Sequence, residues 1–142
     1  MSAQPEILHA SAVAVDNKGL LIIGGSGSGK SSLALELIAL GARLIADDTV
    51  IVTPKTEDAV WASVPETTQG LIEARGVGVL ATSSQGAFLS AVVDLDEIEK
   101  DRLPIRRDKL VAGVSLPLLY RVVSPSFASI LLVYLKGQRC NP

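Results

Sequence analysis

Eight residues, from Gly24 to Ser31, constrain the fold of this chain more than any other segment. They read Gly-Gly-Ser-Gly-Ser-Gly-Lys-Ser, the phosphate-loop pattern in which two glycines with four residues between them are followed by lysine and serine. The apolar run Leu20 to Ile23 predicts a buried strand before the loop, and leucines at helical spacing predict a helix from Ser31 to Leu40 after it. A strand, a glycine-rich loop and a helix in this order predict a nucleotide-binding α/β domain.

Each residue type in the loop has a chemical task. Glycines let successive backbone N–H groups turn toward phosphate oxygens, and the N-terminus of the helix adds the positive end of its dipole. Lys30 is placed to reach the β and γ phosphates, and Ser31 to ligate magnesium. We therefore predict a nucleotide site made of Gly24, Gly25, Ser26, Gly27, Ser28, Gly29, Lys30 and Ser31.

A pair of acids follows the next predicted strand, Arg43 to Ala46. Asp47 and Asp48 fall at the carboxyl end of that strand, where open α/β sheets place their ligands. Adjacent side chains on a strand point to opposite faces, so one of the two faces the nucleotide unless the strand ends between them. The alternative is a solvated turn. A guanine-reading Asn-Lys-x-Asp string is missing, since Asn17 to Leu20 precedes the loop and lacks the aspartate, which argues against a GTPase.

The rest of the chain predicts a strand-rich middle and a C-terminal helix. Ser11 to Val15, a turn and the apolar run before the loop predict a hairpin, and the first fifty residues form a βαβ unit. Ser124 and Pro125 are typical of a helix start and precede an apolar face that contains Phe127 and Leu131. Further short strands are predicted at Val50 to Val52, Val60 to Ala62, Leu71 to Glu73 and Ala91 to Leu95.

Composition limits the class of protein. A chain of 142 residues with 48% hydrophobic and 20% charged residues fits one globular domain over residues 1–142. With 4% aromatic residues and a net charge of -2, nucleic acid is not an expected partner. The single cysteine, Cys140, and an opening that has neither a signal-peptide pattern nor a membrane-length apolar run predict a cytoplasmic protein that is neither exported nor embedded in a membrane.

Several strings together resemble the catalytic domain of HPr kinase/phosphorylase, a P-loop kinase of the phosphoenolpyruvate carboxykinase-like class. The most specific is Ile72-Glu73-Ala74-Arg75-Gly76-Val77-Gly78, about forty residues beyond the phosphate loop. The others are Leu8-His9, the loop itself, Ala34-Leu35-Glu36-Leu37 and Leu44-Ile45-Ala46-Asp47-Asp48. The resemblance is close from Leu8 to Val79 and fainter from Asp101 to Lys109.

The resemblance implies roles for individual residues. His9, Lys30, Asp48 and Arg102 become catalytic, with Asp48 accepting the serine proton and Arg102 stabilising the transferred charge. Ser31, Glu73 and Asp47 become the magnesium ligands. For Arg75 two interpretations stay open, a catalytic cation or a structural partner of Glu73 or Asp47.

Departures from the family pattern imply a short form. The family's N-terminal domain is not expected, because the motifs begin at His9. Ser32 and Ala81 replace a glutamate and an asparagine, and the Pro-x-Arg-Pro-Gly-Arg string is reduced to Pro104-Ile105-Arg106-Arg107-Asp108-Lys109. Forward transfer is therefore expected to dominate over the reverse phosphorylase reaction, while the role of Arg106, Arg107 and Lys109 stays open.

The resemblance implies that the chain uses ATP and magnesium to phosphorylate a serine of an HPr-like phosphocarrier of a bacterial phosphotransferase system, as a hexamer. Two other functions remain. A small-molecule P-loop kinase requires a closed polar pocket. A nucleotide-binding regulatory module without turnover is compatible with the short chain and its altered motifs.

Overall fold

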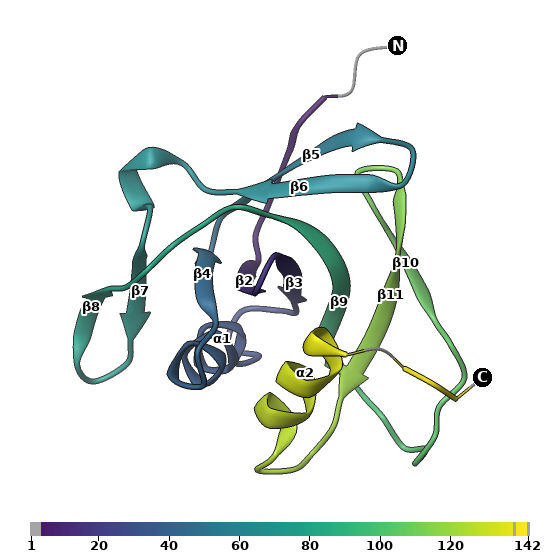
Figure 1. Cartoon of the computed structure of the whole chain (residues 1–142). Coiled ribbons are helices and arrows are strands. Elements are labelled where there is room, and N and C mark those ends of the chain that lie inside the picture. The colour runs from purple at the N-terminus through teal and green to yellow at the C-terminus, as the bar shows by residue number, and fades with distance from the viewer. Residues whose placement is uncertain (1–3, 138, 142) are drawn as a thin grey trace.

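Residues 4–137 and 139–141 of the computed structural model form a curved nine-stranded sheet with two helices on one of its faces, and a separate two-stranded antiparallel sheet within residues 71–81 (Figure 1). The helices are α1 (Lys30–Ala39) and α2 (Phe127–Lys136), and a short 3-10 turn covers Glu66–Thr68. The strands are β1 (Glu6–Leu8), β2 (Ser11–Val15), β3 (Lys18–Ile23), β4 (Arg43–Ala46), β5 (Val50–Thr56), β6 (Ala59–Ser63), β7 (Leu71–Ala74), β8 (Gly78–Ala81), β9 (Ala87–Ile98), β10 (Asp108–Val111) and β11 (Val114–Arg121).

The order of the main sheet puts the phosphate loop at its centre. The order is β1-β5-β6-β9-β3-β2-β4, with β11 parallel to β9 and β10 antiparallel to β11. β3 pairs with β9 in parallel, and β2 pairs antiparallel with both β3 and β4. The expected βαβ unit is thus β3-α1-β4, whose two strands are parallel but separated by β2. The loop that follows β3 has β2 and β4 on one side and β9 and β11 on the other.

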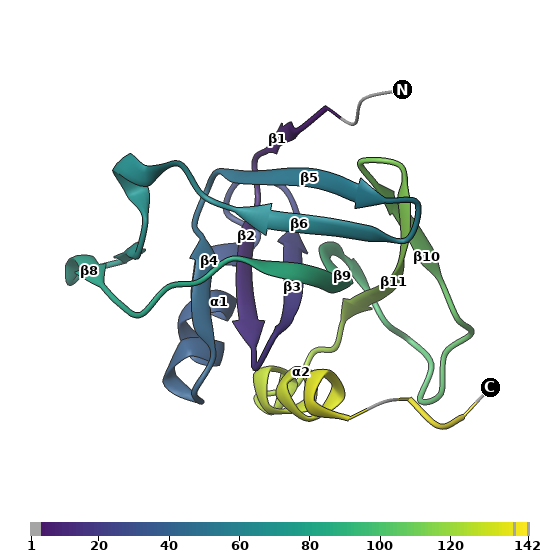
Figure 2. The ribbon, with the colours of Figure 1, turned by 45° about the horizontal axis from the view of Figure 1, so that its top comes forward.

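Two apolar layers hold the sheet. One packs β2, β3 and β9 against the helices and includes Val13, Ile22, Leu37 and Leu131. The other, on the opposite face, lies under β5, β6, β10 and β11 (Figure 2). Because both faces are covered, all five residues of β2 are buried, which explains why its sequence alternates only between small and branched apolar side chains.

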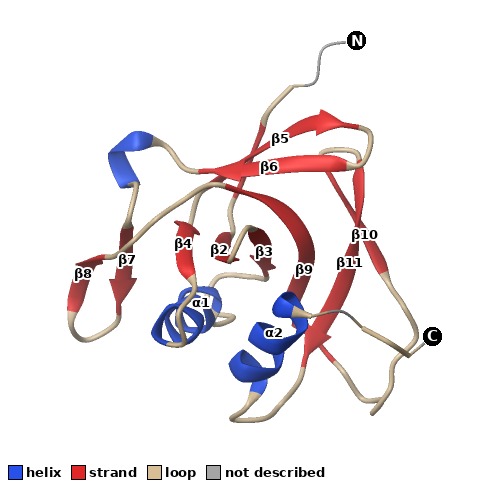
Figure 3. Cartoon of the chain, viewed as in Figure 1, coloured by secondary structure: helices blue, strands red, loops and turns tan. Residues whose placement is uncertain are grey.

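Most predicted elements are confirmed, with shifted ends. α1 begins at Lys30, one residue before the predicted start. α2 begins at Phe127, two residues after the start that Ser124 and Pro125 predicted, and its N-cap is Ser126. Ser124 Oγ instead accepts a hydrogen bond from the Ser126 backbone N–H at 3.1 Å, in the turn before the helix. Both helices lie on the same side of β2 and β3 (Figure 3). Among the described residues, no helix is long and apolar enough to span a membrane.

Candidate active site

The phosphate loop leaves β3 through a glycine whose replacement would strain the backbone and crowd Ser28. Gly24 has φ 154°, and a Cβ placed there would lie 2.5 Å from Ser28 Oγ. Gly29, with φ 101°, turns the chain into α1. Ser28 Oγ is buried and has no hydrogen-bond partner among the described residues. The loop therefore keeps a polar group unpaired at the place where phosphate oxygens are expected.

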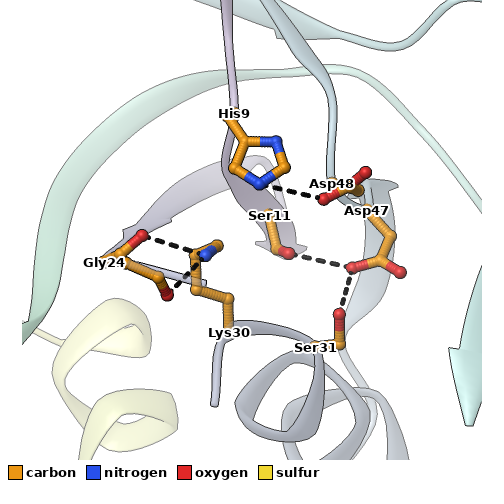
Figure 4. Close-up of polar contacts among 8 residues, drawn as sticks. His9, Ser11, Gly24, Lys30, Ser31, Asp47 and Asp48 are labelled. Atoms are coloured by element: carbon orange, nitrogen blue, oxygen red, sulfur yellow. Dashed lines mark hydrogen bonds and ion pairs between the residues drawn. The ribbon is translucent and has the colours of Figure 1, made fainter. Parts of the chain in front are cut away.

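Charged side chains hold this loop from two directions. The Lys30 ammonium donates to the carbonyl oxygens of Gly24 at 2.9 Å and Gly25 at 3.0 Å (Figure 4). The Gly25 backbone N–H donates to the Asp96 carboxylate at 2.9 and 3.1 Å. The lysine is 8% exposed, so its charge is held beside the loop instead of being spread into solvent. A bound phosphate would offer the Lys30 ammonium a stronger, charge-assisted partner than these carbonyl oxygens.

Asp47 connects the start of α1 to β2. Its Oδ1 accepts hydrogen bonds from Ser31 Oγ at 2.7 Å and from Ser11 Oγ at 2.9 Å, and its Oδ2 accepts a long bond of 3.4 Å from the Glu73 backbone N–H. Magnesium is usually bound by one or two carboxylates together with substrate phosphates and water. Within residues 4–137 and 139–141 no group of three or more His, Cys, Asp or Glu gathers around one point. The carboxylate and hydroxyl of Asp47 and Ser31 nevertheless fit that smaller requirement.

Asp48 turns away from Asp47 because the backbone changes direction between them. β4 ends at Ala46, before both acids, and Asp48 adopts the left-handed region with φ 70°. Its Oδ1 lies 3.3 Å from Nε2 of His9, and these side chains are 69% and 62% exposed. A non-glycine residue in this region costs free energy, and such strain often occurs at functional sites. The two acids therefore reach different partners, Asp47 the start of α1 and Asp48 the imidazole of His9 (Figure 4).

One cleft of about 280 Å³ collects these groups beside the loop. It lies on the β2 and β4 side of β3 and contains most of the residues singled out from the sequence. Asp47 borders it through Ser11 and Ser31. The lining residues are His9, Ser11, Ser26, Gly27, Gly29, Lys30, Ser31, Ser32, Leu35, Asp48, Glu73 and Arg75.

Arg102 lies elsewhere, in an exposed loop after β9, and it does not line the cleft. The cation that contacts the phosphate loop from outside is Arg121, whose Nη2 donates to the Ser28 carbonyl oxygen. Neither Arg121 nor Asp96 belongs to a motif, which is why the sequence did not point to them. Ser11 could have been noticed in the sequence, because it is the one polar residue of a strand that is otherwise apolar and buried.

The three cations that the sequence left open have separate positions. Arg107 pairs with Glu99 at 2.5 Å and stacks over Tyr120 at 4.2 Å. Arg106 donates to the Asn141 carbonyl oxygen at 2.8 Å. Lys109 lines a small cavity of about 210 Å³ that it shares with His9. Arg107 thus fastens the 104–109 segment to β9 and β11 rather than facing the phosphate loop.

The family described as "HPr Serine kinase C-terminal domain" matches residues 1–109. This chain belongs to that family. Among HPr kinase/phosphorylases, the protein of Geobacillus thermodenitrificans is 38% identical over 131 residues, covering 83% of this chain and 42% of the relative. The protein of Limosilactobacillus reuteri is 37% identical over 123 residues, covering 78% and 38%. This family member therefore spans about two-fifths of the length of these relatives.

A solved structure supports the fold of this HPr serine kinase C-terminal domain. The Hpr(Ser) kinase/phosphatase from Coxiella burnetii superposes with a TM-score of 0.76, covering 92% of this chain and 94% of the other, at 20% sequence identity. The expected P-loop kinase fold, with its strand-rich middle and C-terminal helix, is confirmed. The match to the family ends at residue 109, so β11 and α2 lie beyond it.

Proposed function

We propose that this chain is an ATP-dependent serine kinase that acts on an HPr-like phosphocarrier protein. The observation that carries the proposal is that the phosphate loop and the His9 and Asp48 pair line the same cleft. A nucleotide held by Lys30 and an acceptor hydroxyl held by Asp48 would therefore meet there. The names of the relatives, HPr kinase/phosphorylase, support the choice of acceptor.

In the proposed reaction, Lys30 exchanges its carbonyl partners for the β and γ phosphate oxygens of ATP. Asp48 accepts the proton of the acceptor serine, and His9 orients the carboxylate through their 3.3 Å contact. The serine oxygen forms a bond to the γ phosphorus while the bond between that phosphorus and the β–γ bridging oxygen breaks, and ADP leaves. Phosphoryl transfer asks the protein chiefly for such positioning and charge stabilisation.

The residues expected to hold magnesium are Ser31, Asp47 and Glu73. The hydrogen bond between Ser31 Oγ and Asp47 keeps both oxygens at the start of α1, and Glu73 lines the cleft nearby. When bound, magnesium would neutralise phosphate charge and so ease the transfer of the phosphoryl group. The hydroxyl of Ser11 donates to the same Asp47 oxygen as Ser31 and helps to fix the orientation of the carboxylate.

The openness of the cleft favours a protein acceptor over a small molecule. His9 and Asp48 are more than half exposed, so a serine carried on the surface of another protein can approach them. A small-molecule kinase instead encloses its substrate in a dry pocket. A regulatory module that only binds nucleotide has no use for a carboxylate and histidine pair beside the loop.

The proposal extends to the setting of the reaction. We propose one catalytic domain over residues 1–142 that works as a hexamer in the bacterial cytoplasm, where ATP is at hand. Sedimentation of the purified chain would measure its assembly.

Transfer of the γ phosphate tests the function. The purified protein is incubated with magnesium, ATP and an HPr-like carrier, and the modified residue is located by mass spectrometry. We expect phosphoserine on the carrier, and none on a carrier whose acceptor serine is replaced by alanine. ATP hydrolysis without carrier modification would contradict the proposal.

A further inference from the structure

A second cavity lies across the phosphate loop from the catalytic cleft. Its volume is about 480 Å³, within the range of roughly 300 to 1,000 Å³ that is typical of small-molecule sites. It lies on the β9 and β11 side of β3, and its walls include Leu95, Val122 and Phe127. Gly29 and Ser32 line both this cavity and the cleft, so the two spaces meet at the first turn of α1.

The position of the catalytic groups fixes which end of a nucleotide belongs in each space. Asp48, His9 and Glu73 all line the cleft, and none of them lines the second cavity. The γ phosphate must therefore face the cleft, where the acceptor hydroxyl is activated. The remainder of the nucleotide leaves the loop past Gly29 and Ser32, on the side where the second cavity opens.

The chemistry of the second cavity suits a nucleoside. Leu95, Val122 and Phe127 offer apolar surface to the faces of a base, while Glu36 at the rim offers only acceptors, which suit an amino group or a ribose hydroxyl. Arg121 donates to the Ser28 carbonyl oxygen and thereby ties this wall to the loop. We infer that the segment from Arg121 to Phe127, together with Leu95 and Glu36, forms the nucleoside subsite for ATP. The inference rests on the proposed kinase function.

Comparing ATP with tripolyphosphate isolates the nucleoside part, because both ligands carry three linked phosphates. Calorimetry with magnesium measures both dissociation constants for the unsubstituted protein, Val123→Glu and Val133→Glu. Val123 lines the cavity and is 75% exposed, whereas Val133 is 70% exposed on α2 and does not line it. We expect ATP to bind more tightly than tripolyphosphate, and Val123→Glu to remove about tenfold of that preference by placing a carboxylate against the base. Val133→Glu should leave the preference unchanged.

The outcomes separate the subsite from the function. Equal affinities of the unsubstituted protein for ATP and tripolyphosphate, or equal effects of the two substitutions, would overturn the subsite while leaving a phosphate-binding kinase intact. Binding of neither ligand would overturn the proposed function instead. A second measurement needs no variant: photolabelling with 8-azido-ATP should mark the tryptic peptide that begins at Val122 or the one that begins at Ser31. Labelling confined to the peptide from Thr56 to Arg75, which contains β7 and none of the residues of the subsite, would contradict the inference.

Discussion

The two sides of the phosphate loop are built from different kinds of residue. On the β2 and β4 side the cleft presents a histidine, a lysine, acids and hydroxyls, and the acids Asp47 and Asp48 are paired with hydroxyls and with the histidine respectively. On the β9 and β11 side the larger cavity is mostly apolar, with Arg121 and Glu36 as its charged members. Both sides touch the same first turn of α1.

This difference shows how one loop can serve two tasks. Bond-making at the γ phosphate needs charges and a proton acceptor, whereas holding a nucleoside needs apolar surface and a few polar contacts. The sheet separates these tasks because β3 has different neighbours on its two sides. Substitution of the proton acceptor Asp48 in the cleft should therefore change the rate of transfer, and substitutions on the cavity side the affinity for ATP.

The largest effect is expected in the phosphate loop, at the lysine that lines the cleft. Lys30→Ala removes the charge that meets the β and γ phosphates, and transfer should fall by at least about a thousandfold. The ammonium contacts only carbonyl oxygens of its own loop in the hydrogen bonds that hold it, so the thermal melting curve should change little. Lys55→Ala, an exposed change on β5, is the matched control. Turnover like that of the unsubstituted protein would exclude the loop from the mechanism.

The next largest effect is expected from Asp47→Asn, which separates magnesium binding by Asp47 from proton acceptance by Asp48 within the cleft. The amide keeps the shape of the carboxylate but loses its charge, so magnesium-dependent ATP binding should weaken by about 10- to 100-fold. Titration of magnesium at fixed ATP gives this value, and Asp58→Asn in an exposed turn provides the control. If Asp47→Asn instead abolishes transfer with ATP affinity intact, the roles of the two acids are exchanged.

A smaller effect concerns the direction of the reaction. Phosphorolysis must place an added phosphate beside phosphoserine, but Arg107 is already paired with Glu99, and Ala81 lacks a side-chain donor. We expect weaker pyrophosphate release from phosphoserine carrier and excess phosphate than forward transfer under matched conditions. Comparable rates in the two directions would show that Lys109, beside His9, or another cation supplies the missing contact.

The smallest effect on activity is expected from the ion pair between Arg107 and Glu99, which lines neither the cleft nor the cavity. Burial raises the pKa of Glu99, but the hydrogen bond and charge of Arg107 and backbone N–H groups outweigh it, so the net pKa is lowered from 4.5. Arg107→Leu should lower the melting temperature by about 5 °C or more at neutral pH and leave the transfer rate unchanged at low temperature. A depressed carboxylate pKa stabilises the fold above the unfolded value. The difference between the two proteins should therefore shrink as pH falls below 4.5.

The cleft side could be predicted from the sequence because its residues occur in short, local patterns. The phosphate loop, the acids after β4 and the Glu73 string each lie within a few residues of a strand end or turn. The left-handed backbone at Asp48 was not foreseeable, although it accompanies the change of direction that brings Asp47 to Ser31 and Asp48 to His9.

The cavity side could not be predicted because it is assembled from distant apolar residues. β11 contains Pro117, which is unusual in a strand and interrupts the alternation of apolar and polar residues that predicts one. The structure accommodates this proline where β11 pairs with the edge strand β10. Arg121 and Asp96 reach the loop only because β11 and β9 run parallel to each other beside β3. Arg102 was expected in the catalytic site from the fainter resemblance between Asp101 and Lys109, and that resemblance gave no information on the path of the loop after β9.

The division of labour is tested most directly by measuring two quantities on the same preparations of Asp48→Asn and Val123→Glu. These are the rate of transfer to the carrier serine at saturating ATP and the dissociation constant of ATP. Asp48→Asn should lose about 100- to 10,000-fold in rate with its ATP affinity unchanged, because general base help acts on the acceptor. Val123→Glu should lose ATP affinity and keep its rate at saturation. Proportional losses of rate and affinity in both variants would contradict the account.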